Sequence, residues 1–176
     1  MALPDYQEVT QGTAIVWGEA GASGVTATLS LDALANGAAQ QGAAVDLGAN
    51  FARRYRVVLR VETGTAPTAG NTVDLYLVTS HDNTNWPAKV TGSNGSYTLG
   101  TSDANLRQAG PPVVSLIATA DANTVLEQDA VIWEPCGRYV VPIVDNNLGQ
   151  ALRDETTATN NDSRVILVPL RDVIND

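Results

Sequence analysis

One short polar stretch contains the side-chain types that a hydrolytic site would need. Ser80, His81 and Asp82 stand in a row, and His81 is the only histidine of the chain. A nucleophile, a base and an orienting group must converge on one point to act together. Adjacent residues of a strand point to opposite faces, so these three cannot form a triad among themselves. We interpret the stretch as turn chemistry, in which Asp and Asn side chains bond to their own backbone.

A second candidate is the carboxylate pair Glu127 and Asp129. The two residues share one face of a predicted strand because they stand two positions apart. Paired carboxylates can hydrolyse glycosides, but the same face is expected to carry Val131 and Trp133, and nothing in the sequence marks a cleft there. We interpret it as a solvated strand face. The sequence therefore predicts no catalytic residue and no enzyme.

Oxygen ligands gather in two loops, at positions 82–85 (DNTN) and 153–163 (RDETTATNNDS). Neither loop matches the spaced Asp-rich pattern that binds Ca²⁺ in EF-hands, so hydrogen-bonded turns are expected instead. The single cysteine, Cys136, excludes an internal disulfide and a thiolate metal cluster. No metal and no cofactor is predicted.

An arginine stripe lies on one face of an alternating segment, at Arg54, Arg56 and Arg60. Such a stripe could dock on acidic groups of a neighbouring subunit through bidentate Arg–carboxylate pairs. The alternative is neutralisation within the chain, by Asp74 on the expected partner strand and by Glu62. We assign Arg60 to internal pairing, and Arg54 and Arg56 to partner contact.

Three aromatic residues in polar segments are further candidates for contact. Trp86 and Tyr97 belong to a long loop, and Tyr6 belongs to the N-terminal segment. Exposed aromatic rings could form a stacking platform for sugars. Because aromatic residues make up only 5% of the chain, we favour packing or subunit contact over sugar binding. Trp86, Tyr97 and Tyr6 are therefore named as partner-contact candidates.

The elements that must position these side chains show a dominant hydrophobic period of two, which is typical of half-buried strands. No amphipathic helix of useful length is predicted, and the alanine-rich segment 34–48 is expected to be a loop with at most one helical turn. Strands are predicted within 13–18, 24–34, 44–47, 52–63, 72–80, 111–120, 124–135, 138–147 and 163–174.

Two details of strand pairing are also predicted. Segments 52–63 and 72–80 are joined by GTAPTAGN, a turn signal, so they are expected to form an antiparallel hairpin. Pro142 and Pro169 stand inside strand candidates. Because proline cannot donate to a ladder, these positions are expected at sheet edges or bulges.

The fold class predicted from this pattern is all-β, a single antiparallel β-sandwich that is jelly-roll-like with long loops. We divide the 176 residues into an N-terminal arm (1–12) and one sandwich domain (13–176). The domain projects a loop at 81–112, which exceeds the usual length of a structureless loop and is either mobile or laid against something.

The charge balance bears on partners. A formal charge of −9 opposes nucleic-acid binding, which depends on neutralising phosphates. The opening MALPDYQEVT lacks a signal-peptide pattern, and no apolar run approaches the length of a membrane span. We expect a chain that is made in the cytoplasm without export, and that has no membrane or nucleic-acid partner.

The order of the motifs carries a resemblance. LANGAAQQGAAVDLGAN, an alternating strand, VDLYLVTSHDNTNWP and VTGSNGSYTLG follow one another between Leu29 and Gly100. This region resembles small β-sandwich structural proteins of tailed bacteriophages, in particular head decoration (cement) proteins. Ser80, Asp82 and Trp86 are also similar to a turn in discoidin-like sugar-binding sandwiches.

The resemblance implies a protein on the outer capsid surface of a virion, often a trimer, that staples copies of the major capsid protein or other virion proteins together. An acidic chain suits the outside of a DNA-filled shell. We therefore predict a non-enzymatic capsid decoration protein. The alternatives are a phage tail or head-fibre subunit and a carbohydrate-binding β-sandwich module.

Overall fold

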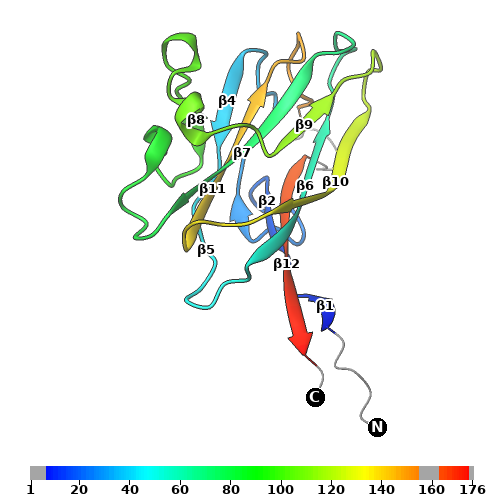
Figure 1. Cartoon of the computed structure of the whole chain (residues 1–176). Coiled ribbons are helices and arrows are strands. Elements are labelled where there is room, and N and C mark those ends of the chain that lie inside the picture. The colour runs from blue at the N-terminus through cyan, green and yellow to red at the C-terminus, as the bar shows by residue number, and fades with distance from the viewer. Residues whose placement is uncertain (1–6, 155–162, 175–176) are drawn as a thin grey trace.

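Two six-stranded sheets packed face to face make up the protein (Figure 1). The structure, a computed structural model, describes residues 7–154 and 163–174. Tyr6 and most of the polar segment 153–163 lie outside the described residues. The predicted all-β sandwich is confirmed.

Sheet A contains β1 (Gln7–Gln11), β2 (Ile15–Gly18), β3 (Ala27–Thr28), β6 (Arg54–Glu62), β10 (Val125–Trp133) and β12 (Arg164–Ile174). Sheet B contains β4 (Ala38–Gln41), β5 (Val45–Asp46), β7 (Thr72–Ser80), β8 (Gly95–Tyr97), β9 (Val114–Ile117) and β11 (Tyr139–Asn146). Three short 3₁₀ helices, η1 (Pro87–Lys89), η2 (Thr101–Asp103) and η3 (Leu106–Ala109), lie between β7 and β9. Among the described residues, no helix is long and apolar enough to cross a membrane.

The strand order is that of a jelly roll. The main strands, in chain order β2, β4, β6, β7, β9, β10, β11 and β12, pair first with last (β2–β12), second with seventh (β4–β11), third with sixth (β6–β10) and fourth with fifth (β7–β9). Sheet A then runs β10-β6-β12-β2, and sheet B runs β9-β7-β11-β4. This is a hairpin rolled into two sheets, the double Greek key that defines the jelly roll.

The predicted hairpin between 52–63 and 72–80 is wrong. β6 pairs with β10 and β12 in sheet A, whereas β7 pairs with β11 and β9 in sheet B. The connection between β6 and β7 crosses from one sheet to the other, so both strands turn their apolar faces toward the same core. Asp74 of β7 therefore does not lie beside the arginine stripe of β6.

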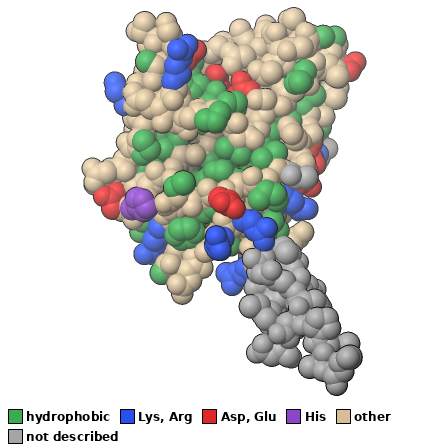
Figure 2. Space-filling model, viewed as in Figure 1, with side chains coloured by type: hydrophobic (Ala, Val, Ile, Leu, Met, Phe, Trp, Pro, Cys, Tyr) green, Lys and Arg blue, Asp and Glu red, His purple; other side chains and the backbone are tan. Residues whose placement is uncertain are grey.

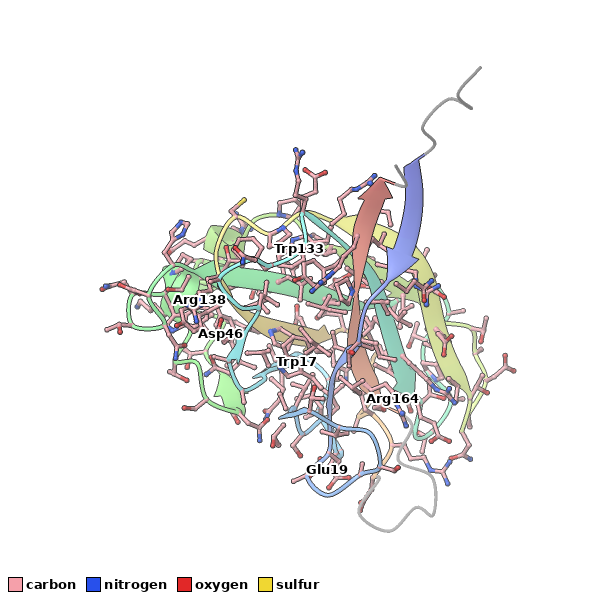
Figure 3. The ribbon with its side chains drawn as sticks, turned by 90° about the horizontal axis from the view of Figure 1, so that it is seen from below. Trp17, Glu19, Asp46, Trp133, Arg138 and Arg164 are labelled. Carbon is pink, nitrogen blue, oxygen red and sulfur yellow. The ribbon has the colours of Figure 1, made fainter. Side chains whose placement is uncertain are left out.

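The main core fills the space between the sheets. Alternate residues of β6, namely Tyr55, Val57, Leu59 and Val61, are buried, as the period of two predicts. Trp17 of β2 is fully buried, and its indole Nε1 donates to the Ala43 carbonyl at 2.7 Å. Figure 3 shows Trp17 in the interior of the molecule.

Pro142 of β11 and Pro169 of β12 lie inside their strands in the same way, each with its carbonyl bonded to the amide of a glycine. Pro142 accepts a hydrogen bond from the Gly42 amide at 2.9 Å, and Pro169 accepts one from the Gly12 amide at 2.9 Å. Each proline lies where two short strands follow one another along its strand: β5 and β4 beside β11, and β2 and β1 beside β12. The proline positions are thus local gaps in the ladder, although both strands have neighbours on either side.

The long loop 81–112 lies against the outer face of sheet B and builds a second apolar cluster there. In Figure 1 this green segment packs beside β4 and β11. The buried members of the cluster are Ala39, Val78, Ala88, Val90, Tyr97, Leu106, Val141 and Ile143. The loop is therefore laid against the sandwich, which is one of the two predicted alternatives.

The alanine-rich segment also differs from its prediction. Ala38–Gln41 forms β4, because its backbone pairs with both β11 and β8. Tertiary pairing here overrides the weak helical preference of alanine.

Candidate functional site

The stretch from Ser80 to Asn85 is a hydrogen-bonded turn. Asp82 accepts from the Asn85 and Thr84 amides at 2.8 and 2.9 Å, and from the Ser80 hydroxyl at 3.0 Å. These bonds, led by that of the Asn85 amide, hold the pKa of Asp82 well below its usual range. His81 is exposed. The interpretation as turn chemistry is confirmed.

The arginine stripe of β6 is met by acids from β10. Arg56 Nε lies 3.3 Å from Asp129, and Arg60 Nη1 lies 3.5 Å from Glu127. Arg60 is thus paired within the chain as expected, but by Glu127 and not by the predicted Asp74. Arg56 is paired as well, whereas partner contact by Arg54 and Arg56 stays a prediction. All four paired side chains are a third or more exposed, so the pairs add little to stability.

A bulge in β10 decides which side chains meet the arginines. The register shifts between Gln128 and Val131, which changes the phase of the strand. Glu127 faces outward opposite Arg60, while Trp133 pairs with Tyr55 and packs on the main core. The expectation that Glu127 and Asp129 share a face with Val131 and Trp133 is therefore wrong.

The two aromatic candidates of the long loop pack against sheet B. Tyr97 is 6% exposed, and its hydroxyl donates to the Ala88 carbonyl at 2.5 Å. Trp86 is partly buried against the second apolar cluster, between the long loop and the outer face of sheet B. Tyr97 is thus occupied within the chain, and Trp86 keeps only part of its surface for a partner or a sugar.

One exposed ion pair fastens the lower end of sheet B. Asp46 of β5 and Arg138, just before β11, point toward one another in Figure 3. Arg138 Nε donates to Asp46 Oδ1 at 2.7 Å and Nη2 donates to Oδ2 at 2.5 Å. This bidentate geometry lowers the pKa of Asp46. Arg138 therefore has a structural role, because it joins β5 to the start of β11.

An acidic pocket opens on the outer face of sheet B beside the long loop. It is a cavity of about 260 Å³. Figure 2 shows acidic side chains gathered near the top of this face, above a hydrophobic band. Its lining residues are Asp74, Tyr76, Asp103, Leu106, Arg107, Gly110, Asp145 and Asn147.

Two of these aspartates stand directly opposite one another. Asp74 of β7 and Asp145 of β11 are cross-strand partners in the antiparallel ladder, a position where like charges are destabilising. Asp145 is 6% exposed. Its Oδ2 accepts from Asn147 Nδ2 at 2.8 Å, while its buried Oδ1 accepts no hydrogen bond from the described residues.

The electrostatics follow from this arrangement. Burial, together with the charges of Asp74 and Asp103, raises the pKa of Asp145. Burial and the same three aspartates raise the pKa of Tyr76 to about 12. The pocket is thus a site of negative potential in which Asp145 Oδ1 has no donor among the described residues. Such perturbed clusters mark functional sites.

The sequence alone does not indicate this pocket. Asp74 is expected opposite the arginines of β6, because segments 52–63 and 72–80 are predicted to pair. Asp145 stands in the segment VDNN, at the end of a predicted strand. The only available signal was two acidic residues on outward faces of separate strands, and nothing local indicated that these strands are neighbours.

A metal centre has no support in the described residues, where no three His, Cys, Asp or Glu side chains are placed to hold an ion. Comparisons of the chain with protein-family models, with curated proteins and with solved structures found no match.

The final candidate surface is a ribbon formed by both ends of the described chain. β1 pairs with the last residues of β12, from Gln7↔Ile174 to Gln11↔Leu170. In Figure 1 this two-stranded ribbon extends away from the sandwich. The predicted N-terminal arm thus includes a strand that is paired within sheet A.

Proposed function

We propose that this protein is a non-enzymatic structural component of a bacteriophage particle, a decoration protein that binds the outer surface of an assembled head. The observation that carries the proposal is the ribbon of β1 and the end of β12, which extends from a packed sandwich (Figure 1). Backbone groups along such a ribbon can pair with an extended segment of a partner.

Two further features support this function. The fold is a jelly roll, an architecture that viral capsid proteins use repeatedly, although a shared fold is an analogy and other functions use it too. In addition, the side chains that could have formed a hydrolytic site are engaged in the fold, Ser80 and Asp82 in a turn and Glu127 and Asp129 in ion pairs.

The proposed mechanism is stabilisation by linkage. A protein that binds the assembled lattice, and not the separate subunits, raises the stability of the shell by mass action. At a free concentration of 100 times its Kd, each bound copy contributes about 2.7 kcal/mol. The resemblance of the region from Leu29 to Gly100 to head decoration proteins also leads us to propose a trimer, whose partners are copies of the major capsid protein.

The test needs a label at one exposed thiol. Cys136, the only cysteine of the chain, is exposed but lines a surface hollow beside Trp133 and Pro112, so the label is moved to the exposed turn between β2 and β3 by combining Cys136→Ser with Ser23→Cys. This purified variant, labelled at position 23, is added to heads that lack the protein, and its position is imaged while head stability is measured by heating. We expect label over the outer shell and a higher temperature of head disruption. Absence of binding, or bound heads that are no more stable than bare ones, would falsify the proposal.

The images also separate the alternatives. Label confined to the tail or to fibres would assign the chain to those structures instead.

Removal of residues 1–11 gives a variant that tests the ribbon, since it deletes β1 and leaves the Gly12–Pro169 hydrogen bond in place. We expect this variant to fold but to bind heads at least about tenfold more weakly, corresponding to about 1.4 kcal/mol.

A further inference from the structure

The acidic pocket contains an arrangement that a folded chain does not need for its own stability. Asp74 and Asp145 face each other across two central strands, and Asp145 Oδ1 is buried without a donor among the described residues. A buried acceptor that is left without a donor destabilises the folded protein. Conflicts of this kind are expected at functional sites, where a ligand supplies the missing group.

From this geometry we infer that the acidic pocket binds the guanidinium group of an arginine side chain presented by a partner protein. The choice of a cation follows from charge, since three aspartates line the cavity and Arg107 is the only basic residue among the lining residues. Arg107 itself is exposed at the rim.

The size and shape of the pocket favour a side chain. Its volume of about 260 Å³ falls below the range of about 300–1,000 Å³ that is typical of small-molecule sites. A planar guanidinium presents five donors in a fork and can bridge two facing carboxylates, which an ammonium point charge does less well. The ring of Tyr76, two residues from Asp74 on the same strand face, offers a surface on which a guanidinium can stack.

The neighbourhood of the pocket favours a protein as the source of that group. On the other side of η3 lies a second hollow of about 370 Å³, lined by apolar side chains that include Leu77, Pro112 and Trp133. Leu106 and Arg107 of η3 line the acidic pocket, while Gln108 and Ala109 line the apolar hollow. A segment with an arginine beside apolar residues would fill both, as interface anchors do.

The identity of the partner as a protein rests on the proposed function, whereas the preference of the pocket for a guanidinium does not. The two can fail separately. Head binding without arginine binding would sink only this inference, and arginine binding without head binding would sink only the proposed function.

The first experiment titrates the full-length protein with N-acetyl-argininamide and follows backbone amides by NMR. We expect saturable shifts confined to the pocket lining, with a Kd on the order of 1 mM, and no such shifts with the neutral citrulline analogue. Asp145→Asn should weaken binding at least about tenfold. The matched control is Asp121→Asn, which removes a carboxylate from an exposed turn and should leave the Kd unchanged.

Several outcomes would overturn the inference. Equal binding of the citrulline analogue, or an unchanged Kd in Asp145→Asn, would exclude recognition by charge. Saturable shifts of the same amides with CaCl₂ at lower concentration would assign the pocket to a metal. Binding that appears only in Arg107→Gln would show that the chain fills the pocket with its own arginine.

The second experiment addresses the source of the guanidinium. A short peptide with arginine flanked by leucine and proline is compared with N-acetyl-argininamide. We expect the peptide to bind about tenfold more tightly, corresponding to about 1.4 kcal/mol, and to shift amides of Leu77 and Val113 in the apolar hollow as well. Equal affinity of the two probes would contradict a protein partner and would assign the pocket to a small guanidinium compound.

Discussion

At the scale of single residues, the ionised carboxylate of Asp145 lowers the stability of the folded protein. Its carboxylate is buried opposite Asp74, and its raised pKa reports that the folded protein disfavours the charged form. Above about pH 4 the unfolded chain ionises this group more readily than the folded one, so the group lowers stability as the pH rises through its folded pKa.

Replacement of Asp145 by asparagine should therefore stabilise the protein. The amide keeps an acceptor for Asn147 and can donate toward Asp74. We expect the free energy of unfolding, measured by urea denaturation, to rise by about 0.5–1 kcal/mol at pH 7. No rise is expected at pH 3, where the carboxyl of Asp145 in the unsubstituted protein is protonated in both the folded and the unfolded state. A loss of stability at pH 7 would show that the carboxylate is already satisfied.

Asp82 illustrates the opposite sign. Hydrogen bonds from the Asn85 and Thr84 amides lower its pKa, so its contribution is present above the pKa of unfolded aspartate and is lost as the pH falls through the folded value. We expect Asp82→Ala to accelerate amide hydrogen exchange at Thr84 and Asn85. His81→Ala, which alters the exposed neighbour, is the control and should leave exchange at both amides unchanged.

At the scale of the elements, two glycines make the prolines of β11 and β12 possible. A Cβ at Gly42 would lie 2.8 Å from Pro142 Cγ and 3.0 Å from Trp17 Cδ1, and a Cβ at Gly12 would lie 2.8 Å from Pro169 Cγ. Each glycine therefore lets a backbone amide approach the proline carbonyl while the ring packs against the Cα.

Substitution of either glycine by alanine should cost about 1–3 kcal/mol, because the added methyl overpacks the contact with the ring. Gly95→Ala is the matched control, since a Cβ there meets nothing within 4 Å and no positive φ is recorded for Gly95. Denaturant unfolding of the three variants gives the comparison. Equal stability of Gly42→Ala and Gly95→Ala would contradict this account of the prolines.

At the scale of the whole molecule, the ribbon extends away from the sandwich in Figure 1. Gln11, the last residue of β1, is exposed. The chain thus combines a packed sandwich with an extension in which β1 pairs with the end of β12, and Leu170 at its base also pairs with Arg54 of β6.

Removal of residues 1–11 should consequently leave the sandwich folded. We expect the midpoint of thermal unfolding to move by no more than about 4 °C, which corresponds to about 1 kcal/mol for a chain of this size. Calorimetry of the shortened and full-length chains measures the shift. A much larger drop would mean that β1 is part of the cooperative unit, and the weaker head binding of this variant would then no longer implicate the ribbon.

The sequence by itself determined the class of fold and the positions of most strands. Alternation of apolar and polar residues, as in Tyr55 to Val61, is a local property, because successive side chains of a strand point to opposite faces. The same locality made the turn at Asp82 predictable, since its hydrogen bonds join residues within five positions of one another.

Only the tertiary structure decided which strands are neighbours and therefore where charges meet. The pairing of Asp74 with Asp145 joins residues that are far apart in the chain, and the bulge after Gln128 turns Val131 and Trp133 toward the core, away from the face on which Glu127 meets Arg60. A one-residue shift or a change of sheet exchanges the partners of a side chain without altering the local pattern. For this reason the sandwich could be predicted from the sequence, whereas the acidic pocket could not.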